Sequence, residues 1–149
     1  MKNLFKTDAG WSGLILRVML GAVMFPHGTQ KLLGWFGGYG FSVTISAFTD
    51  KMHLPAALAL LVIFGEAFGA VGLICGFLSR VAAFGILCIM TGAIATVHWP
   101  NGFFMNWSGK QAGEGFEYHL LAIAISAAIL IGGSGRWSVD RAIAARLEE

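Results

Sequence analysis

Two charged residues lie inside otherwise apolar stretches of this sequence, Arg17 and Glu66. A charge near the middle of a bilayer costs about 2.5–3.5 kcal/mol on insertion scales, so each is expected to have a partner or a chemical role. Counted from the outer end of each apolar stretch at about 1.5 Å per helical residue, the two residues fall within about one helical turn of the same depth in the membrane. An Arg17–Glu66 pair is therefore geometrically allowed. Such a pair either fixes helix register, or makes Glu66 a proton-carrying or ligand-binding carboxylate whose ionisation Arg17 controls. Glu66 and Arg17 are therefore the candidate catalytic residues.

Six further polar side chains lie near the ends of the apolar stretches, and they are expected to converge on the outer half of the molecule. A quinone headgroup needs a hydrogen-bond donor for each carbonyl oxygen and a proton source, which imidazole, phenol, ammonium and carboxyl groups supply. The alternative is that amphipathic rings among them only anchor the helices at the headgroup level. The candidate ligand-binding residues are His27, Lys31, His98, Glu117, Tyr118 and His119.

The residues that commonly bind metals or exchange electrons do not have the spacing of a known site. Neither H-x-x-x-H nor E-x-x-H occurs, so no metal site is expected. Cys75 and Cys88 lie in apolar runs without a C-x-x-C motif, and they are expected to be packing residues. No haem, flavin or iron–sulfur motif is present, so no covalent cofactor is expected, and a quinone is the candidate bound cofactor.

The composition is that of a membrane protein. Of the 149 residues, 56% are hydrophobic and 12% are charged, whereas about a quarter of a soluble domain is charged. There is too little polar surface to cover a globule in water, so the expected partner is the lipid bilayer. The net charge of +2 and the lack of a basic stripe exclude a nucleic-acid partner.

Four stretches are long and apolar enough to cross the hydrocarbon as helices, at about 11–30, 56–78, 81–97 and 116–133. Little more than Ser79-Arg80 joins the second to the third, which forces an antiparallel hairpin. An interfacial helix is expected at about 41–52, and a cytoplasmic C-terminal helix on the inner membrane surface at about 138–147. The predicted fold is an all-α integral membrane protein, an up-down four-helix transmembrane bundle in one domain of residues 1–149.

Basic residues are distributed unequally between the two sides of the four stretches. Six lie on the side of the termini and three on the other side, which places both termini in the cytoplasm by the positive-inside rule. The six are Lys2, Lys6, Arg80, Arg136, Arg141 and Arg146, and the three are Lys31, Lys51 and Lys110.

Five short motifs follow one another along most of the chain. They are Arg17, His27-Gly28-x-x-Lys31, Glu66 followed by Gly69, Gly76 and Arg80, Gly115-x-Glu117-Tyr118, and Gly133-x-Gly135-x-x-Ser138-x-Asp140. In order and spacing they resemble the DoxX family of small four-span membrane proteins. The resemblance implies a bacterial cytoplasmic (inner) membrane protein that serves as a membrane component of an oxidoreductase assembly. The chain lacks the cysteine pair that dithiol-exchanging relatives use, which argues against direct thiol–disulfide exchange.

The leading hypothesis is a DoxX-type multi-pass subunit of an oxidoreductase system that holds a quinone or a similar apolar redox molecule between its helices. In this hypothesis His27, Lys31, Glu117 and His119 surround the headgroup, with Glu66 and Arg17 deeper in the bundle. One alternative is a non-catalytic membrane scaffold that recruits a redox protein partner through its inner surface. Another is a small transporter or proton path, with Glu66 as the carrier and a homo-oligomer as the working form.

Overall fold

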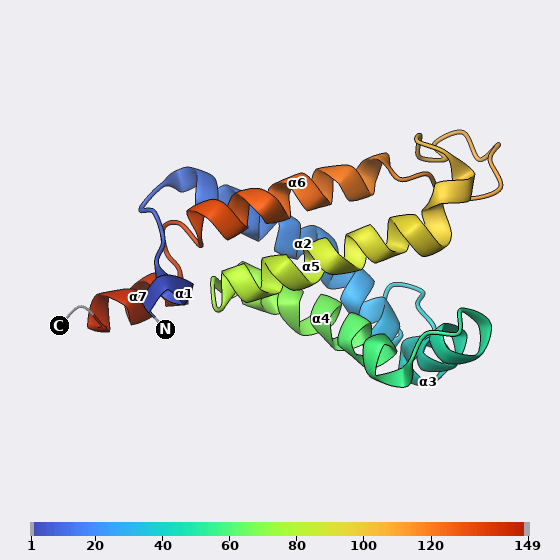
Figure 1. Ribbon diagram of the computed structural model, residues 1–149, viewed down its shortest axis with the longest axis horizontal. Coiled ribbons are helices and arrows are strands. Elements are labelled where there is room, and N and C mark those ends of the chain that lie inside the picture. Colours follow the sequence, from blue (N-terminus) through green and yellow to red (C-terminus); the bar gives the residue numbers. More distant parts are fainter. Residues whose placement is uncertain (1, 148–149) are drawn as a thin grey trace.

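The computed structural model describes residues 2–147, and this part of the chain is helical with no strand. The expected all-α class is thereby confirmed. Four long helices run along the long axis of the molecule (Figure 1): α2 (Trp11–Leu33), α4 (Ala56–Cys75), α5 (Ser79–Ala93) and α6 (Glu117–Gly132). Helix α2 packs against α4 and α6, and α5 packs against the same two helices.

The short elements gather at the two ends of the long helices (Figure 1). One end, called the terminal end below, holds α1 (Lys2–Phe5) and α7 (Val139–Arg146). The other, called the loop end, holds α3 (Gly40–Ser46), the π-helix η1 (Ala47–Lys51) and the loop that precedes α6. Helix α5 also ends there, through a π-helical turn η2 (Ile94–His98) and a 3₁₀ turn η3 (Trp99–Asn101).

Glycines in the left-handed conformation end two of the long helices. Gly34 has φ 75° at the end of α2, and Gly76 has φ 69° at the end of α4. This backbone conformation is costly for residues with a Cβ atom, so glycine is the residue that lets the chain leave each helix. Pro55, which has no backbone N–H, directly precedes α4.

Small residues bring α2 and α4 into close contact and fix their register. A Cβ atom on Gly28 would lie 2.5 Å from Ala67 Cα, and one on Gly21 would lie 2.8 Å from the Ala70 carbonyl oxygen. Glycines at such positions let two helix backbones approach closely in a membrane protein. Their positions show that α2 and α4 are antiparallel, with Gly28 beside Ala67.

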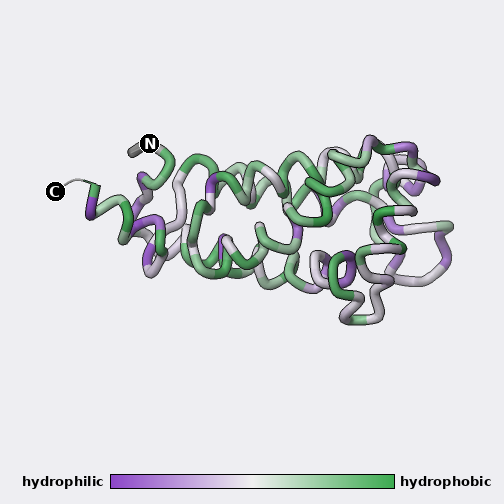
Figure 2. The backbone as a smooth tube through the Cα atoms, turned by 90° about the horizontal axis from the view of Figure 1, so that it is seen from below, coloured by the Kyte–Doolittle hydropathy of each residue, from purple (hydrophilic) through white to green (hydrophobic). Residues whose placement is uncertain are grey.

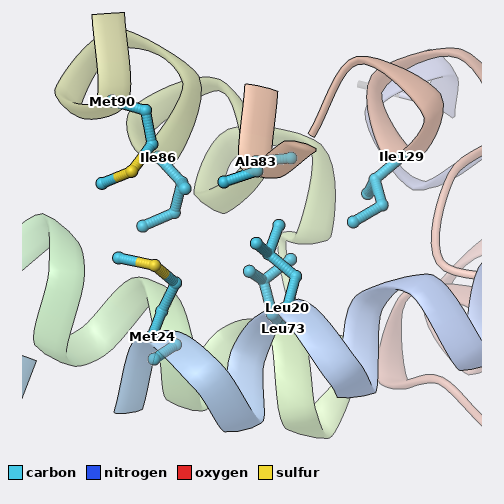
Figure 3. Packing of buried hydrophobic residues seen from close by; sticks show 9 residues of the cluster. Leu20, Met24, Leu73, Ala83, Ile86, Met90 and Ile129 are labelled. Atoms are coloured by element: carbon cyan, nitrogen blue, oxygen red, sulfur yellow. The ribbon is translucent and has the colours of Figure 1, made fainter. Parts of the chain in front are cut away.

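The core lies between the two ends, where all four long helices meet (Figure 3). Its largest members are fully or almost fully buried side chains that approach one another across the helix interfaces. They are Leu20 and Met24 of α2, Leu73 of α4, Ile86 and Met90 of α5, and Ile129 of α6. The middle of the bundle is therefore a closed apolar layer.

The outward surface of the bundle is apolar as well. Figure 2 shows hydrophobic residues through the middle of the molecule and hydrophilic ones gathered at its ends. Large side chains such as Phe68, Leu121 and Ile131 have 64%, 67% and 82% of their surface exposed. Two helical segments, Ala56–Cys75 and Ser79–Asn101, are long and apolar enough to cross a membrane, and Glu117–Gly132 is a shorter apolar helix. Such a surface is covered by lipid rather than water.

Candidate functional site

The loop-end half of the bundle contains a buried ion pair between α2 and α4. Lys31 Nζ lies 2.5 Å from Glu66 Oε2, and the side chains of Lys31 and Glu66 are 25% and 4% exposed. It is the one salt bridge among residues 4–147. Lys31 Nζ also donates to the His27 carbonyl oxygen at 3.4 Å. A buried charge is costly without a partner, so each of these two side chains stabilises the charge of the other.

The predicted pairing of Arg17 with Glu66 is wrong. The expected depths of Arg17 and Glu66 hold only if α2 and α4 end at the same level. The contact of Gly28 with Ala67 instead brings Lys31 beside Glu66, because the loop-end part of α4 extends past the end of α2. The same register puts Arg17 beside Leu73 and Ile74, at the terminal end of α4.

Aromatic and imidazole rings border the ion pair. The ring centroids of His27 and Tyr118 lie 6.2 Å apart, so α6 contributes to the site across from α2. The Tyr118 hydroxyl donates a weak hydrogen bond to Met24 Sδ at 3.5 Å. Because a thioether sulfur is a weak acceptor, this hydroxyl can donate to an oxygen of a ligand instead.

The rings of His98 and His119 overlap at the same end, with centroids 4.0 Å apart. His98 Nδ1 lies 2.8 Å from the carbonyl oxygen of Glu114, so this nitrogen carries the hydrogen and donates it. His119 is only 6% exposed, and its Nδ1 has no hydrogen-bond partner among the described residues. An unpartnered buried polar atom costs about 1–3 kcal/mol, so this nitrogen is poised to receive a partner.

The histidine pair does not have the geometry of a shared metal ligand set. Rings that bind one tetrahedral metal at about 2.0–2.1 Å have centroids about 5 Å apart, whereas those of His98 and His119 are 4.0 Å apart. Within residues 2–147, no three His, Cys, Asp or Glu side chains are arranged to hold a metal ion. The arrangement instead suits hydrogen bonding to a polar group.

Glu117 turns away from these residues. Its Oε1 accepts hydrogen bonds from the backbone N–H of Met105 at 2.8 Å and from Trp107 Nε1 at 3.4 Å. The carboxylate therefore fixes the loop before α6. The structure brings together six of the eight predicted site residues, called the polar cluster below: His27, Lys31, Glu66, His98, Tyr118 and His119.

Arg17 is the centre of a separate structural site at the terminal end. It is 1% exposed and donates five hydrogen bonds, all to backbone carbonyl oxygens. A guanidinium has five N–H donors, so the bonding capacity of the group is filled. The five bonds join the last turn of α4 to the segment after α6. Their acceptors are the carbonyl oxygens of Leu73, Ile74, Ser134, Arg136 and Trp137. Its predicted place beside Glu66 in the catalytic site does not fit this geometry.

Asp140, the last residue of the fifth sequence motif, completes the terminal-end site. It is 1% exposed and accepts from the backbone N–H groups of Leu78 at 2.7 Å and Ser79 at 2.9 Å. The hydroxyl of Ser134 also donates to this carboxylate. Asp140 thus caps the N terminus of α5 from a distant part of the chain. The signal that could have found it is the Ser138-x-Asp140 spacing, since Ser138 Oγ accepts from the Arg141 N–H and caps α7.

An all-helical chain with a lipid-facing apolar surface and buried charges that meet inside it is a membrane protein. The family model of DoxX matches residues 12–99, more than half of the chain, and the chain belongs to the DoxX family. It is similar to the uncharacterized membrane protein Rv3486 of Mycobacterium tuberculosis, with 29% identity over 148 residues that cover 91% of this chain and 83% of the relative. No solved structure matches the sequence.

Proposed function

We propose that this chain is a membrane subunit of an oxidoreductase system, and that the polar cluster binds a quinone-type ligand from the bilayer. The observation that carries this proposal is the Lys31–Glu66 pair at the same end of the bundle as His119, a buried histidine whose Nδ1 has no hydrogen-bond partner among residues 4–147. A purely structural ion pair explains the two charges but not an unpartnered imidazole nitrogen at the same end. Since the chain has no haem, flavin or iron–sulfur motif, electrons reach the ligand through a redox protein partner.

The donors of the polar cluster match the needs of a quinone. An ammonium has three donors, and Lys31 uses two of them, on Glu66 and on the His27 carbonyl. The remaining donor, the Tyr118 hydroxyl and His119 Nδ1 are available for the two carbonyl oxygens of the ring. Glu66 is a carboxylate within reach of Lys31 and can exchange a proton with the reduced ligand.

Burial across the polar cluster varies in a way that suits a ligand from the lipid. His27 is exposed on the side of the bundle, and Lys31 and Tyr118 are half-buried. Glu66 and His119 are buried. A flat apolar molecule that approaches from the bilayer meets His27 first and reaches the buried groups last.

We also infer that all four long helices cross the membrane as an up-down bundle with both termini in the cytoplasm. The two charges of α2 are satisfied inside the protein, Arg17 by carbonyl oxygens and Lys31 by Glu66, which removes the main cost of a bilayer position. Both ends of the described chain lie at the same end of the molecule, as an even number of crossings requires (Figure 1). The excess of Lys and Arg on that side favours the bacterial cytoplasmic membrane with this orientation.

Titration of a short-tailed quinone against the purified protein tests ligand binding. Trp99, next to His98 and stacked on Phe116, serves as the fluorescent reporter. We expect saturable quenching of tryptophan emission in the wild type, and binding about tenfold weaker in Lys31→Met and in His119→Phe, from the loss of a desolvated hydrogen bond. Glu117→Gln is the matched control, because this carboxylate faces the loop. Quenching that is not saturable, or that is equal in all four proteins, contradicts the proposal.

A further inference from the structure

A polar pocket lies at the terminal end, far along the bundle from the polar cluster. It has a volume of about 330 Å³ and is lined by Lys6, Thr7, Asp8, Arg80, Ile131 and Gly132. Its charged lining consists of two cations and one carboxylate. Hydrogen bonds from the Asp8 N–H to the Gly132 carbonyl and from the Gly135 N–H to Thr7 Oγ1 hold the N-terminal segment against the end of α6.

Arg80 is fixed in this pocket by carbonyl oxygens, and no carboxylate of residues 4–147 is its partner. Its Nε and Nη2 donate to the Lys6 carbonyl at 3.4 and 3.1 Å, Nη2 donates to the Ile131 carbonyl at 3.0 Å, and Nη1 donates to the Leu130 carbonyl. These four bonds leave one of the five guanidinium N–H donors free. The side chains of Lys6 and Asp8 form no hydrogen bond or ion pair with any of residues 4–147. Three charges thus line one small pocket without satisfying one another.

An apolar groove continues from the pocket between α2 and α6. It shares Asp8, Ile131 and Gly132 with the pocket, extends to Leu16 and Ala128, and has a volume of about 320 Å³. Its floor is formed by glycines, since a Cβ atom on Gly13 would lie 2.8 Å from Gly135 Cα. A charged pocket that opens into an apolar groove, at the surface where helices leave the membrane, has the polarity pattern of a phospholipid site.

We propose that the pocket and groove bind one phospholipid whose headgroup carries both a phosphodiester and a primary ammonium. The phosphate oxygens accept from the free N–H of Arg80 and from the Lys6 ammonium, while the headgroup ammonium donates to Asp8. One acyl chain fills the groove beside Leu16 and Ala128. A purely anionic headgroup would face Asp8 with like charge, and a quaternary ammonium has no N–H to donate to it.

Native mass spectrometry of the full chain in detergent, with equal amounts of three phospholipids of identical acyl chains, tests this inference. We expect phosphatidylethanolamine to be retained about fivefold more than phosphatidylglycerol or phosphatidylcholine, the size expected for a partly exposed charge pair. Asp8→Asn should remove this preference, and Lys6→Gln should weaken the retention of all three lipids. Arg146→Gln, a change of charge on α7 outside the pocket, is the matched control and should behave like the wild type.

Two further measurements distinguish the contribution of the groove to lipid retention from that of the pocket. Ala128→Phe places a ring in the groove from an exposed helix position, so it should lower the retention of all three lipids without changing their order. Soluble glycerophosphoethanolamine at the same concentration should not be retained, since it lacks the acyl chain. The proposal is overturned if phosphatidylglycerol is preferred and Asp8→Asn has no effect, or if the soluble headgroup binds as well as the lipid. Thermal unfolding of each variant is recorded, and a variant of Lys6, Asp8 or Ala128 that both unfolds and retains the three lipids like the wild type also counts against the site.

Discussion

Two positive charges on α2 are satisfied by different chemistry. Arg17 binds five neutral carbonyl oxygens, whereas Lys31 binds one carboxylate and one carbonyl. The planar guanidinium fits many fixed acceptors, and its bonding is complete within the protein. The ammonium retains a free donor and belongs to the polar cluster, in which His119 Nδ1 has no hydrogen-bond partner among the described residues. The first residue is therefore structural, and the second is the better candidate for binding a ligand.

A double-mutant cycle on Lys31 and Glu66 tests the buried ion pair. Lys31→Met should reduce the free energy of unfolding by about 3 kcal/mol, because Glu66 is left buried without a partner, and Glu66→Gln should reduce it by less, because Lys31 is partly exposed. The double variant should lose less than the sum of the two, with a coupling energy of about 1–2 kcal/mol. Denaturant unfolding in mild detergent gives all four values. Additive losses would show that the two side chains do not interact.

Substitution of Arg17 by lysine separates its structural role from a catalytic one. An ammonium has three donors, so at least two of the five carbonyl oxygens lose their partner, and the free energy of unfolding should fall by at least about 2 kcal/mol. Quinone affinity of the folded protein should stay unchanged. Arg141→Lys, at an exposed position of α7, is the control and should leave unfolding as in the wild type. If Arg17→Lys lowers the affinity for quinone while the free energy of unfolding stays as in the wild type, Arg17 is part of the ligand site.

At the scale of the helices, the sequence predicts the elements better than it predicts their relative positions. The stretch expected at 56–78 is α4 (Ala56–Cys75), and the one expected at 116–133 is α6 (Glu117–Gly132). The ends of α4 are determined locally, by the length of the apolar stretch and by Pro55 and Gly76 on either side of it. The register of α2 on α4 depends instead on where Gly28 meets Ala67, a contact between distant parts of the chain. For that reason the buried charges could be found from the sequence while the partner of each could not.

The loop end was also only partly predictable. Six of the eight predicted site residues meet because the loop-end halves of α2, α4 and α6 and the end of η2 lie together. Glu117 is a predicted ligand-binding residue that directly precedes Tyr118 and His119 in the sequence. Adjacent side chains of a helix differ in direction by about 100°, so Glu117 faces the loop instead. Its partners, Met105 and Trp107, lie in an irregular loop whose path has no periodic signal in the sequence.

Replacing Gly28 by alanine tests the α2–α4 register. The new Cβ would lie 2.5 Å from Ala67 Cα, a backbone atom that cannot move alone, so the helices must separate. The free energy of unfolding should fall by about 1–3 kcal/mol, as for other overpacked positions. Gly85→Ala in α5 is the control, because nothing lies within 4 Å of its added Cβ and alanine favours the helix. Equal effects at both positions would contradict the close approach described here.

At the scale of the whole molecule, the two ends have different roles. The terminal end is held by the hydrogen bonds of Arg17 and Asp140, which fix the start of α5 and the segment before α7. The loop end contains the polar cluster with its unpartnered His119 nitrogen. The apolar core, whose side chains Figure 3 shows, lies between the two ends.

Cysteine labelling in intact cells tests the inferred orientation. In a background with Cys75 and Cys88 replaced by alanine, Lys110→Cys at the loop end should react with a membrane-impermeant maleimide. Arg141→Cys at the terminal end should react only after the cells are permeabilised. The reverse pattern, or reaction of both positions in intact cells, would contradict four crossings with cytoplasmic termini.

The most direct test of the central claim is quantification of the quinone that copurifies with the protein in mild detergent. Extraction and mass spectrometry should find stoichiometric quinone in the wild type and in Glu117→Gln, whose carboxylate faces the loop. Lys31→Met and His119→Phe should lose it at matched expression and folding, since each removes a donor of the polar cluster. Wild-type protein without quinone, or equal quinone in all four proteins, would contradict the account.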